Sequence, residues 1–238
     1  MTSQDMLRVD ALEAWYGQAQ VLFRVSLAVA AGECVALVGR NGAGKSTTMK
    51  AIMGLMARRR GSVSFRGRDI SALAPYRIGR LGLGWVPEDR RIFTDLSVRE
   101  NLAVGRQPPR AGAPTWSEDK VYALFPNLQA MPERAGGRMS GGEQQMLTVA
   151  RTLMGNPYLV LLDEPSEGVA PLIVEEMARM IVALKQEGVS VLLSEQNLHF
   201  ARLVADRAVV LEKGQVRYAG SMQELMADES VQRTYLSV

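Results

Sequence analysis

The spacing of apolar and polar residues predicts strands at the start of the chain and helices in its middle. Apolar and polar residues alternate over 7–12 and, more loosely, over 21–29, as they do in half-buried strands. Continuous apolar runs at 34–38 and 158–162 are typical of strands buried on both faces. From residue 94 to 155 the spacing is that of helices. The pattern therefore predicts an α/β chain with a helical segment inserted between its strands.

Further elements fill the rest of the chain. We expect strands at 61–67, 83–88, 190–193, 207–211 and 215–219, and helices at 75–80, 172–187, 198–204 and, at the end of the chain, 228–238. Val38, Leu162 and Leu193 each end a predicted buried strand. Because the carboxyl ends of parallel strands meet at one edge of a sheet, we expect the residues that follow these three to form one site.

A complete phosphate-binding loop of the form G-x-x-x-x-G-K-[ST] follows the first buried strand. Its glycines let backbone N–H groups turn inward, and the helix that begins there points its positive end at the same place. Lys45 is expected to neutralise phosphate oxygens, and Ser46 to offer its hydroxyl to Mg²⁺. An incidental glycine-rich turn is the alternative, which the full match in a strand-to-helix position disfavours. The residues expected to contact a nucleoside triphosphate are Gly39, Asn41, Gly42, Ala43, Gly44, Lys45, Ser46 and Thr47.

Carboxylates follow two other predicted strands. Asp163 and Glu164 end a buried strand, where adjacent charges are costly unless a cation or a water to be activated is present. Asp163 is predicted to hold Mg²⁺, and Glu164 to polarise the water that attacks the γ-phosphate. The alternative is an aspartate that caps the next turn. Glu88 is either a further ligand of Mg²⁺ or water, or an ion-pair partner of Arg90 or Arg91.

A second glycine turn, formed by Ser140, Gly141, Gly142 and Glu143, precedes the periodic run 146–153. A helix amino terminus with a serine hydroxyl and small residues suits an anion. The chain thus carries two phosphate-binding helix ends.

Tyr16 lies at the end of the first predicted strand. An exposed aromatic ring placed there can stack on a purine, and ordinary hydrophobic cover is the equally favoured alternative.

Composition and charge narrow the function. The 238 residues, 47% of them apolar, suffice for one large domain with a buried core. The net charge is only +3, and the basic residues are dispersed, with 58–60 and 90–91 as the only local runs. Nucleic-acid binding normally needs a clustered basic stripe, so solvated surface is the better interpretation of these residues.

The single cysteine, Cys34, allows no internal disulfide and suits a small buried role in a reducing compartment. Residues 1–10 lack the apolar core of a signal peptide, and no stretch of about 18 apolar residues occurs that would span a membrane. If a membrane matters, we expect the chain to reach its cytoplasmic side through a partner.

The motifs at 39–47, 139–145 and 159–164 together resemble the ATPase subunit of ABC transporters, and the resemblance covers essentially the whole chain. The glycine turn at 140–144 is its specific part. The resemblance implies ATP and Mg²⁺ as cofactors, ATP hydrolysis, and a head-to-tail dimer in which the 140–142 turn of one subunit closes over ATP held on Lys45 of the other. It also makes Tyr16 the base-stacking aromatic, Asp163 the metal carboxylate and Glu164 the general base.

Four longer segments, 85–93, 140–147, 166–171 and 194–197, resemble the LivF-type ATP-binding subunit of branched-chain amino-acid importers. This resemblance implies uptake driven by ATP hydrolysis. It implies as partners membrane permeases that contact the helical segment and the Glu88 region, a second and non-identical ATPase, and an extracytoplasmic substrate-binding protein.

Three residues depart from the broader ABC pattern. Glu88 stands where most members have glutamine, Gln196 where most have a switch histidine, and Ala170 where an aspartate is usual. Gln196 can donate a hydrogen bond to the γ-phosphate but carries no positive charge, which favours a slower site in this subunit. His199, the only histidine, is expected on a helix surface rather than as a displaced switch.

The expected fold is α/β, a RecA-like P-loop NTPase core of the ABC type. An amino-terminal antiparallel β subdomain is expected at 1–34, the core with the last strands at 35–87 and 156–238, and an inserted helical subdomain at 88–155.

Two other functions are weighed against an importer ATPase. One is a regulatory ATP-binding half of a heterodimer with little hydrolysis, which Gln196 and Ala170 favour and Glu164 opposes. The other is an ABC ATPase acting on nucleic acid, which the dispersed basic residues disfavour.

Overall fold

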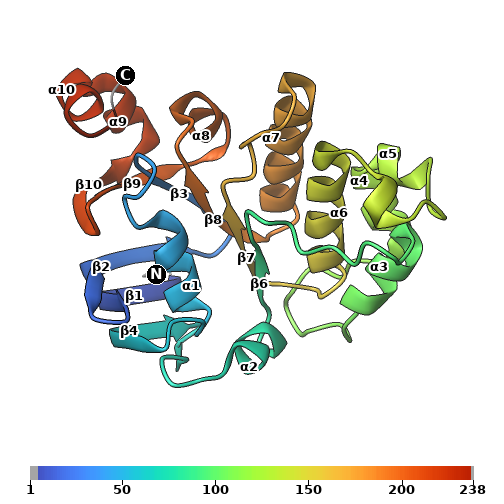
Figure 1. The fold of residues 1–238 in the computed structure, drawn as a ribbon, viewed down its shortest axis with the longest axis horizontal. Coiled ribbons are helices and arrows are strands. Elements are labelled where there is room, and N and C mark those ends of the chain that lie inside the picture. Colours follow the sequence, from blue (N-terminus) through green and yellow to red (C-terminus); the bar gives the residue numbers. More distant parts are fainter. Residues whose placement is uncertain (1–4, 237–238) are drawn as a thin grey trace.

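The computed structural model describes residues 5–236. Its strands form a four-stranded sheet in the order β2-β1-β4-β5 and a six-stranded sheet in the order β10-β9-β3-β8-β7-β6. The two sheets lie toward one side of the molecule, and helices α3 to α6 form a lobe at the other (Figure 1). The predicted mixed α/β architecture, with an antiparallel sheet and an inserted helical segment, is confirmed.

The four-stranded sheet is antiparallel and is built around β1 (Asp5–Tyr16). This strand pairs on one side with β2 (Ala19–Ala30) and on the other with β4 (Arg58–Phe65), which in turn pairs with β5 (Arg68–Asp69). The first two strands are longer than the alternating segments had predicted, and they form a hairpin whose turn contains Gly17.

Strand β4 belongs to the antiparallel sheet, although the antiparallel subdomain was expected to end at residue 34. The strand lies within 35–87, which was assigned to the core, yet Val63 and Phe65 stand opposite Val9 and Leu7 of β1 and are buried with them. Burying these alternate side chains against β1 places the strand in the antiparallel sheet. That sheet is therefore assembled from both sides of the phosphate-binding segment.

The six-stranded sheet positions the predicted site. Strands β6 (Leu83–Val86), β7 (Leu159–Asp163), β8 (Ser190–Glu195), β3 (Cys34–Val38) and β9 (Arg207–Glu212) run parallel, and β10 (Gln215–Ser221) closes the edge antiparallel to β9. Every residue of β3, β7 and β8 is buried, as their apolar runs predict. Their carboxyl ends lie at one edge of the sheet.

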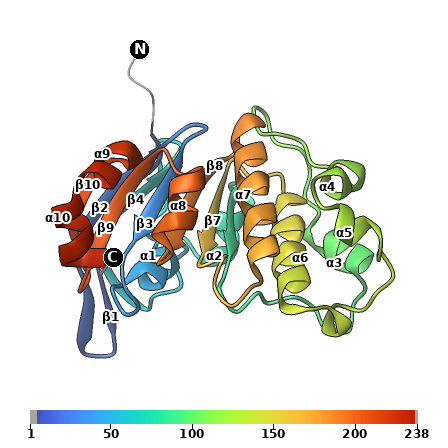
Figure 2. The same cartoon turned by 90° about the horizontal axis from the view of Figure 1, so that it is seen from above.

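Helices flank this sheet and make up the lobe. Figure 2 shows α7 and α6 side by side between the sheet and the shorter helices α3, α4 and α5. Within residues 5–236, no helix combines the length and the apolar character needed to cross a bilayer. The helices are α1 (Lys45–Ile52), α2 (Pro75–Arg80), α3 (Val98–Gly105), α4 (Glu118–Leu124), α5 (Pro126–Gln129), α6 (Gly141–Leu153), α7 (Pro171–Gln186), α8 (Leu198–Val204), α9 (Met222–Ala227) and α10 (Glu229–Val231).

The helix expected at 228–238 is present as α10 followed by a π-helical turn at 232–236. Its last two residues, 237 and 238, lie outside the described residues, as do residues 1–4.

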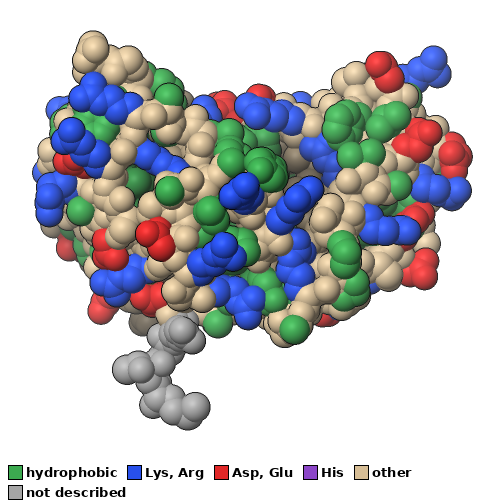
Figure 3. Space-filling view, turned by 90° about the horizontal axis from the view of Figure 1, so that it is seen from below, with side chains coloured by type: hydrophobic (Ala, Val, Ile, Leu, Met, Phe, Trp, Pro, Cys, Tyr) green, Lys and Arg blue, Asp and Glu red, His purple; other side chains and the backbone are tan. Residues whose placement is uncertain are grey.

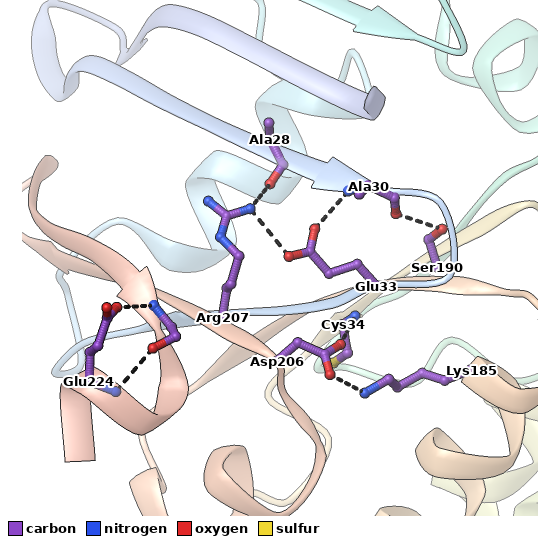
Figure 4. A network of polar contacts seen from close by, with 10 residues as sticks. Ala28, Ala30, Glu33, Cys34, Lys185, Ser190, Asp206, Arg207 and Glu224 are labelled. Atoms are coloured by element: carbon purple, nitrogen blue, oxygen red, sulfur yellow. Dashed lines mark hydrogen bonds and ion pairs between the residues drawn. The ribbon is translucent and has the colours of Figure 1, made fainter. Parts of the chain in front are cut away.

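A polar network ties the amino end of β3 to β9 (Figure 4). The backbone N–H of Cys34 donates to Asp206 Oδ2 over 2.9 Å, and Lys185 Nζ pairs with Asp206 Oδ1 at 2.7 Å. Arg207 pairs with Glu33 at 3.2 Å. Burial raises the pKa of the Cys34 thiol to about 12, so Cys34 is a neutral core residue as expected.

The turn between β9 and β10 holds the phosphate-binding loop in place through Gly214. Its N–H donates to the carbonyl of Ala43, and its carbonyl accepts from the N–H of Phe23 in β2, both over 2.8 Å. Gly214 has φ +74°, and a Cβ there would lie 1.8 Å from the carbonyl oxygen of Val21. Only glycine fits this approach.

Replacing Gly214 by alanine is expected to lower the free energy of unfolding by about 2–4 kcal/mol, because left-handed strain adds to a backbone clash. Gly112, with φ +74° and open space around it, is the matched control, since Gly112→Ala adds only the strain of about 1–2 kcal/mol. Urea unfolding of both variants measures the difference. Equal losses would show that the turn yields to the added methyl group.

Candidate functional site

The phosphate-binding loop connects β3 to α1, as its pattern predicts. Gly44 is the residue before α1 and has φ 107°, and no side chain caps the first N–H groups of the helix. Gly42 also has a positive φ, of 79°. A Cβ on Gly39 would lie 2.3 Å from the carbonyl oxygen of Leu211. The glycines thus permit a tight turn that leaves the N–H groups of the helix end available to an anion.

Lys45 extends from the start of α1 back across this loop. Only 3% of its surface is exposed, and Nζ donates to the carbonyl oxygens of Gly39 at 2.8 Å and Arg40 at 3.1 Å. The same ammonium forms an ion pair with Glu164 Oε1 at 3.0 Å. The structure therefore brings the loop lysine and the second carboxylate of β7 into direct contact.

The carboxylate pair lies at the end of β7, and Ser194 of β8 connects its two members. Ser194 Oγ donates to Asp163 Oδ1 over 2.6 Å and accepts from the backbone N–H of Glu164 at 3.1 Å. Burial raises the pKa of Asp163, and hydrogen bonds from Ser194 and Ser46 oppose that rise. Glu164 is 8% exposed and has φ 47°, a strained conformation of the kind that recurs at functional sites.

The chemistry of Ser46 and Asp163 fits Mg²⁺. Mg²⁺ prefers a few hard protein oxygens together with phosphate and water, and here the hydroxyl of Ser46 in α1 and the buried carboxylate of Asp163 at the end of β7 supply two such oxygens. Among residues 5–236, no three His, Cys, Asp or Glu residues cluster closely enough to hold a metal by themselves. The chain would thus supply two ligands.

Glu88 is exposed in the segment after β6. The ion pair of Arg91 in this segment is with Asp89, at 2.9 Å, rather than with Glu88. The role of Glu88 as a ligand stays a prediction.

The second glycine turn caps α6. Ser140 Oγ accepts from the N–H of Glu143 at 3.3 Å, and Glu143 Oε2 accepts from the N–H of Ser140 at 2.6 Å. A Cβ on Gly141 would lie 2.8 Å from the guanidinium of Arg90. Figures 1 and 2 both place α6 on the far side of β7 from α1. Within one chain, the two helices whose amino ends are predicted to bind anions, α1 and α6, therefore lie on opposite sides of β7.

The remaining predicted residues are exposed. Tyr16 ends β1 with 52% of its surface accessible, and Gln196 directly follows β8. His199 lies on the surface of α8, as expected. We call the cavity beside the carboxylate pair the Glu164 hollow; it has a volume of about 370 Å³ and is lined by Glu164, Ser166, Glu167, Glu195, Gln196 and Asn197.

Sequence reasoning missed the parts played by two residues in this arrangement. The sequence predicted Ser194 at a strand end but not its hydrogen bond to Asp163. A polar residue directly after an apolar strand could have indicated such a role. Glu167 was noted only as part of a motif, although it follows Glu164 by three positions.

Ser194→Ala is expected to lower the free energy of unfolding by about 1–3 kcal/mol, because it leaves buried polar groups with fewer partners. Ser64→Ala, on partly exposed β4, is the control and should change stability by less than about 0.5 kcal/mol. Urea unfolding measures both. A Ser194→Ala chain as stable as the control would show that Asp163 and Glu164 do not depend on this hydroxyl.

Known proteins match this chain over nearly its full length. The profile of the family described as "ABC transporter" matches residues 22–167. The branched-chain amino acid transport ATP-binding protein BraG of Pseudomonas aeruginosa is 42% identical over 97% of this chain and 99% of its own. The lipopolysaccharide export ATP-binding protein LptB of Acidithiobacillus ferridurans is 35% identical, over 98% and 97%. A probable branched-chain amino acid transport ATP-binding protein LivF of Archaeoglobus fulgidus is 32% identical, over 98% and 99%.

A solved structure agrees with the fold. The crystal structure of a nucleotide-free ATP-binding cassette from an ABC transporter superposes with a TM-score of 0.80 at 26% identity, over 95% of this chain and 97% of the other. These matches confirm the resemblance that the motifs indicated. The chain therefore belongs to the ABC transporter family, as an ATP-binding and ATP-hydrolysing subunit.

Proposed function

We propose that this chain is the ATP-hydrolysing subunit that powers an importer of branched-chain or other hydrophobic amino acids. The observation that carries the proposal is the higher sequence identity to an amino-acid transport protein than to an export protein. Identity is 42% with BraG and 35% with LptB, over similar lengths. The segments that resemble LivF-type subunits support the same choice.

In this proposal the phosphates of ATP lie on the loop 39–47, and Tyr16 stacks on the adenine. Lys45 leaves Glu164 and pairs with phosphate oxygens, which carry more negative charge than one carboxylate. Ser46 and Asp163 would hold Mg²⁺, whose charge neutralises the phosphates. Glu164, released from Lys45, takes a proton from the attacking water, while Gln196 donates a hydrogen bond to the γ-phosphate.

The separation of α6 from Lys45 supports a dimer. Because α6 lies on the far side of β7 from α1, we propose that a second subunit, head to tail, places its 140–143 turn over the bound ATP. A non-identical ATPase is the partner we propose. The chain would sit at the cytoplasmic side of the membrane, with a substrate-binding protein acting indirectly from the other side.

The permeases would contact the helical segment and the Glu88 region, as the resemblance to LivF-type subunits implies. On the face of the molecule drawn in Figure 3, Lys and Arg side chains gather in the middle among apolar ones. A groove of about 260 Å³ is lined by residues of α2, β6 and the end of α6, among them Gly79, Trp85 and Thr152. Cross-linking that maps the permease contact to another face would contradict this placement.

Uptake of labelled leucine by cells that lack this chain tests the proposed substrate class. We expect uptake to fall and to be restored by the wild-type chain but not by Lys45→Ala. Unchanged leucine uptake together with defective lipopolysaccharide export would reject an importer and favour the function of the LptB relatives.

The ATPase rate of the purified chain against its own concentration tests the pairing. A specific activity that rises steeply with concentration would mean that the chain forms a competent homodimer, which contradicts an obligatory non-identical partner. Negligible hydrolysis at every concentration, despite ATP binding, is the result that the proposed heterodimer predicts.

A further inference from the structure

A cavity lies where α7 faces α6 and the junction of α4 and α5, in the helical part of the molecule (Figure 2). We call it the α6–α7 cavity. Its volume of about 430 Å³ falls in the range of roughly 300–1,000 Å³ that is typical of small-molecule sites. Its lining includes no residue of the phosphate-binding loop or of the Glu164 hollow. The cavity is therefore separate from the predicted ATP site.

Buried apolar side chains form the inner wall of the α6–α7 cavity. The largest of them are Phe125, Met146, Met177 and Met180. Methionine side chains are flexible and polarisable, so they adapt to apolar groups of different shapes. This wall therefore suits a ligand with a small apolar body whose exact shape can vary.

Two charged side chains of α7, Glu176 and Arg179, also line the cavity. They are three residues apart and so lie on one face of the helix. Among residues 5–236 no ion pair involves either of them, and Lys185, the other cation of α7, pairs with Asp206. Glu176 is half-buried and Arg179 is exposed, which places the two charges toward the solvent side of the apolar wall.

The remaining polar side chain of the lining, Asn127, is already hydrogen-bonded within the chain. Its Nδ2 donates to Met146 Sδ over 2.8 Å, and its Oδ1 accepts from the N–H of Leu128 at 3.0 Å. The lining thus offers a ligand one carboxylate and one guanidinium beside an apolar wall. The complementary molecule carries one ammonium and one carboxylate on an apolar body, which describes an apolar amino acid.

We propose that the α6–α7 cavity binds an apolar amino acid. Its carboxylate pairs with Arg179, whose planar guanidinium matches a carboxylate in shape, and its ammonium pairs with Glu176. Its side chain packs against the methionines. The site itself is argued from the cavity alone, whereas the identity of this ligand with the transported solute rests on the proposed function. A solute bound there would contact α6, which begins at the 140–143 turn, and α7 at once.

Calorimetric titration of the purified full chain with leucine tests the site, and three analogues separate its parts. Isocaproate is leucine without the ammonium, isoamylamine is leucine without the carboxylate, and serine keeps both charges but lacks the apolar side chain. We expect leucine to bind at least about tenfold more tightly than each of them, because each analogue leaves either one charged side chain or the apolar wall without its partner.

Substitutions on α7 assign the two polar contacts. Arg179→Ala should weaken leucine binding by about tenfold and should not weaken the binding of isoamylamine, which has no carboxylate to lose. Glu176→Gln should likewise weaken leucine and should not weaken isocaproate. Glu175→Gln, an exposed carboxylate of α7 outside the lining, is the matched control and should bind leucine as the wild type does.

Three results would overturn the inference. They are no binding of leucine, isoleucine, valine or phenylalanine by the wild-type chain, binding of serine as tight as that of leucine, and an equal loss of leucine and isoamylamine in Arg179→Ala. None of them touches the proposed function, which leucine uptake by cells tests. Leucine binding by a chain whose loss leaves leucine uptake unchanged would reject the proposed function and leave the site in place.

Discussion

Replacing Lys45 by alanine is expected to weaken ATP binding by at least about 100-fold, because charge-assisted contacts to phosphate in a buried site are among the strongest polar interactions. Lys45 is the cation that the structure places against the loop, with Nζ 2.8 Å from the carbonyl oxygen of Gly39. Nothing else within 39–47 supplies a buried positive charge, since Arg40 is exposed. Calorimetric titration with ATP measures the loss.

Lys120→Ala is the matched control for this experiment. Lys120 forms a half-exposed ion pair with Glu187 at 2.5 Å, away from the loop, and its removal should leave the affinity for ATP unchanged. A chain with Lys45→Ala that still binds ATP at micromolar concentrations would refute the placement of the nucleotide site.

Replacing Glu164 by glutamine is expected to slow ATP hydrolysis by about 10²–10⁴-fold, because an amide cannot take the proton of the attacking water. ATP binding should persist and become tighter. In the resting chain Glu164 Oε1 forms an ion pair with Lys45 Nζ at 3.0 Å. A neutral amide at position 164 would compete less well with phosphate for the Lys45 ammonium. Single-turnover hydrolysis and ATP titration of the same preparation measure the two effects separately.

The same substitution decides between the hydrolysing and the regulatory role of the subunit. Introduced into this subunit alone, Glu164→Gln should stop transport if its own site hydrolyses ATP. Transport at the wild-type rate would support a regulatory half, as Gln196 and Ala170 suggested. Glu175→Gln serves again as a control, since it removes an exposed carboxylate from the neighbouring helix without approaching Lys45.

The residues that could be predicted from sequence are those whose chemistry is local. The phosphate-binding loop is contiguous, and Asp163 and Glu164 follow a run of buried apolar residues. Both signals are complete within a few positions. The capping box at Ser140 and Glu143 is likewise a matter of spacing along one helix.

The relations that sequence could not predict join distant segments. The pairing of β4 with β1 depends on which apolar side chains match across about 50 residues, and strand spacing alone does not contain that choice. The contact between Lys45 and Glu164 requires both strand ends in register and a positive φ at Glu164. The hydrogen bond from Ser194 to Asp163 forms because β7 and β8 are adjacent strands in the sheet.

The anchoring of Gly214 has a mechanical consequence. Through its two backbone bonds the β9–β10 turn links Ala43 of the phosphate loop to Phe23 of β2, and β2 is hairpin-paired to the strand that ends at Tyr16. The places proposed for the base and for the phosphates of ATP are therefore braced to one another. We therefore expect any rotation of the helical lobe to leave the base and phosphate sites fixed relative to each other, with the bending confined to the segments between β6 and α3 and between α6 and β7.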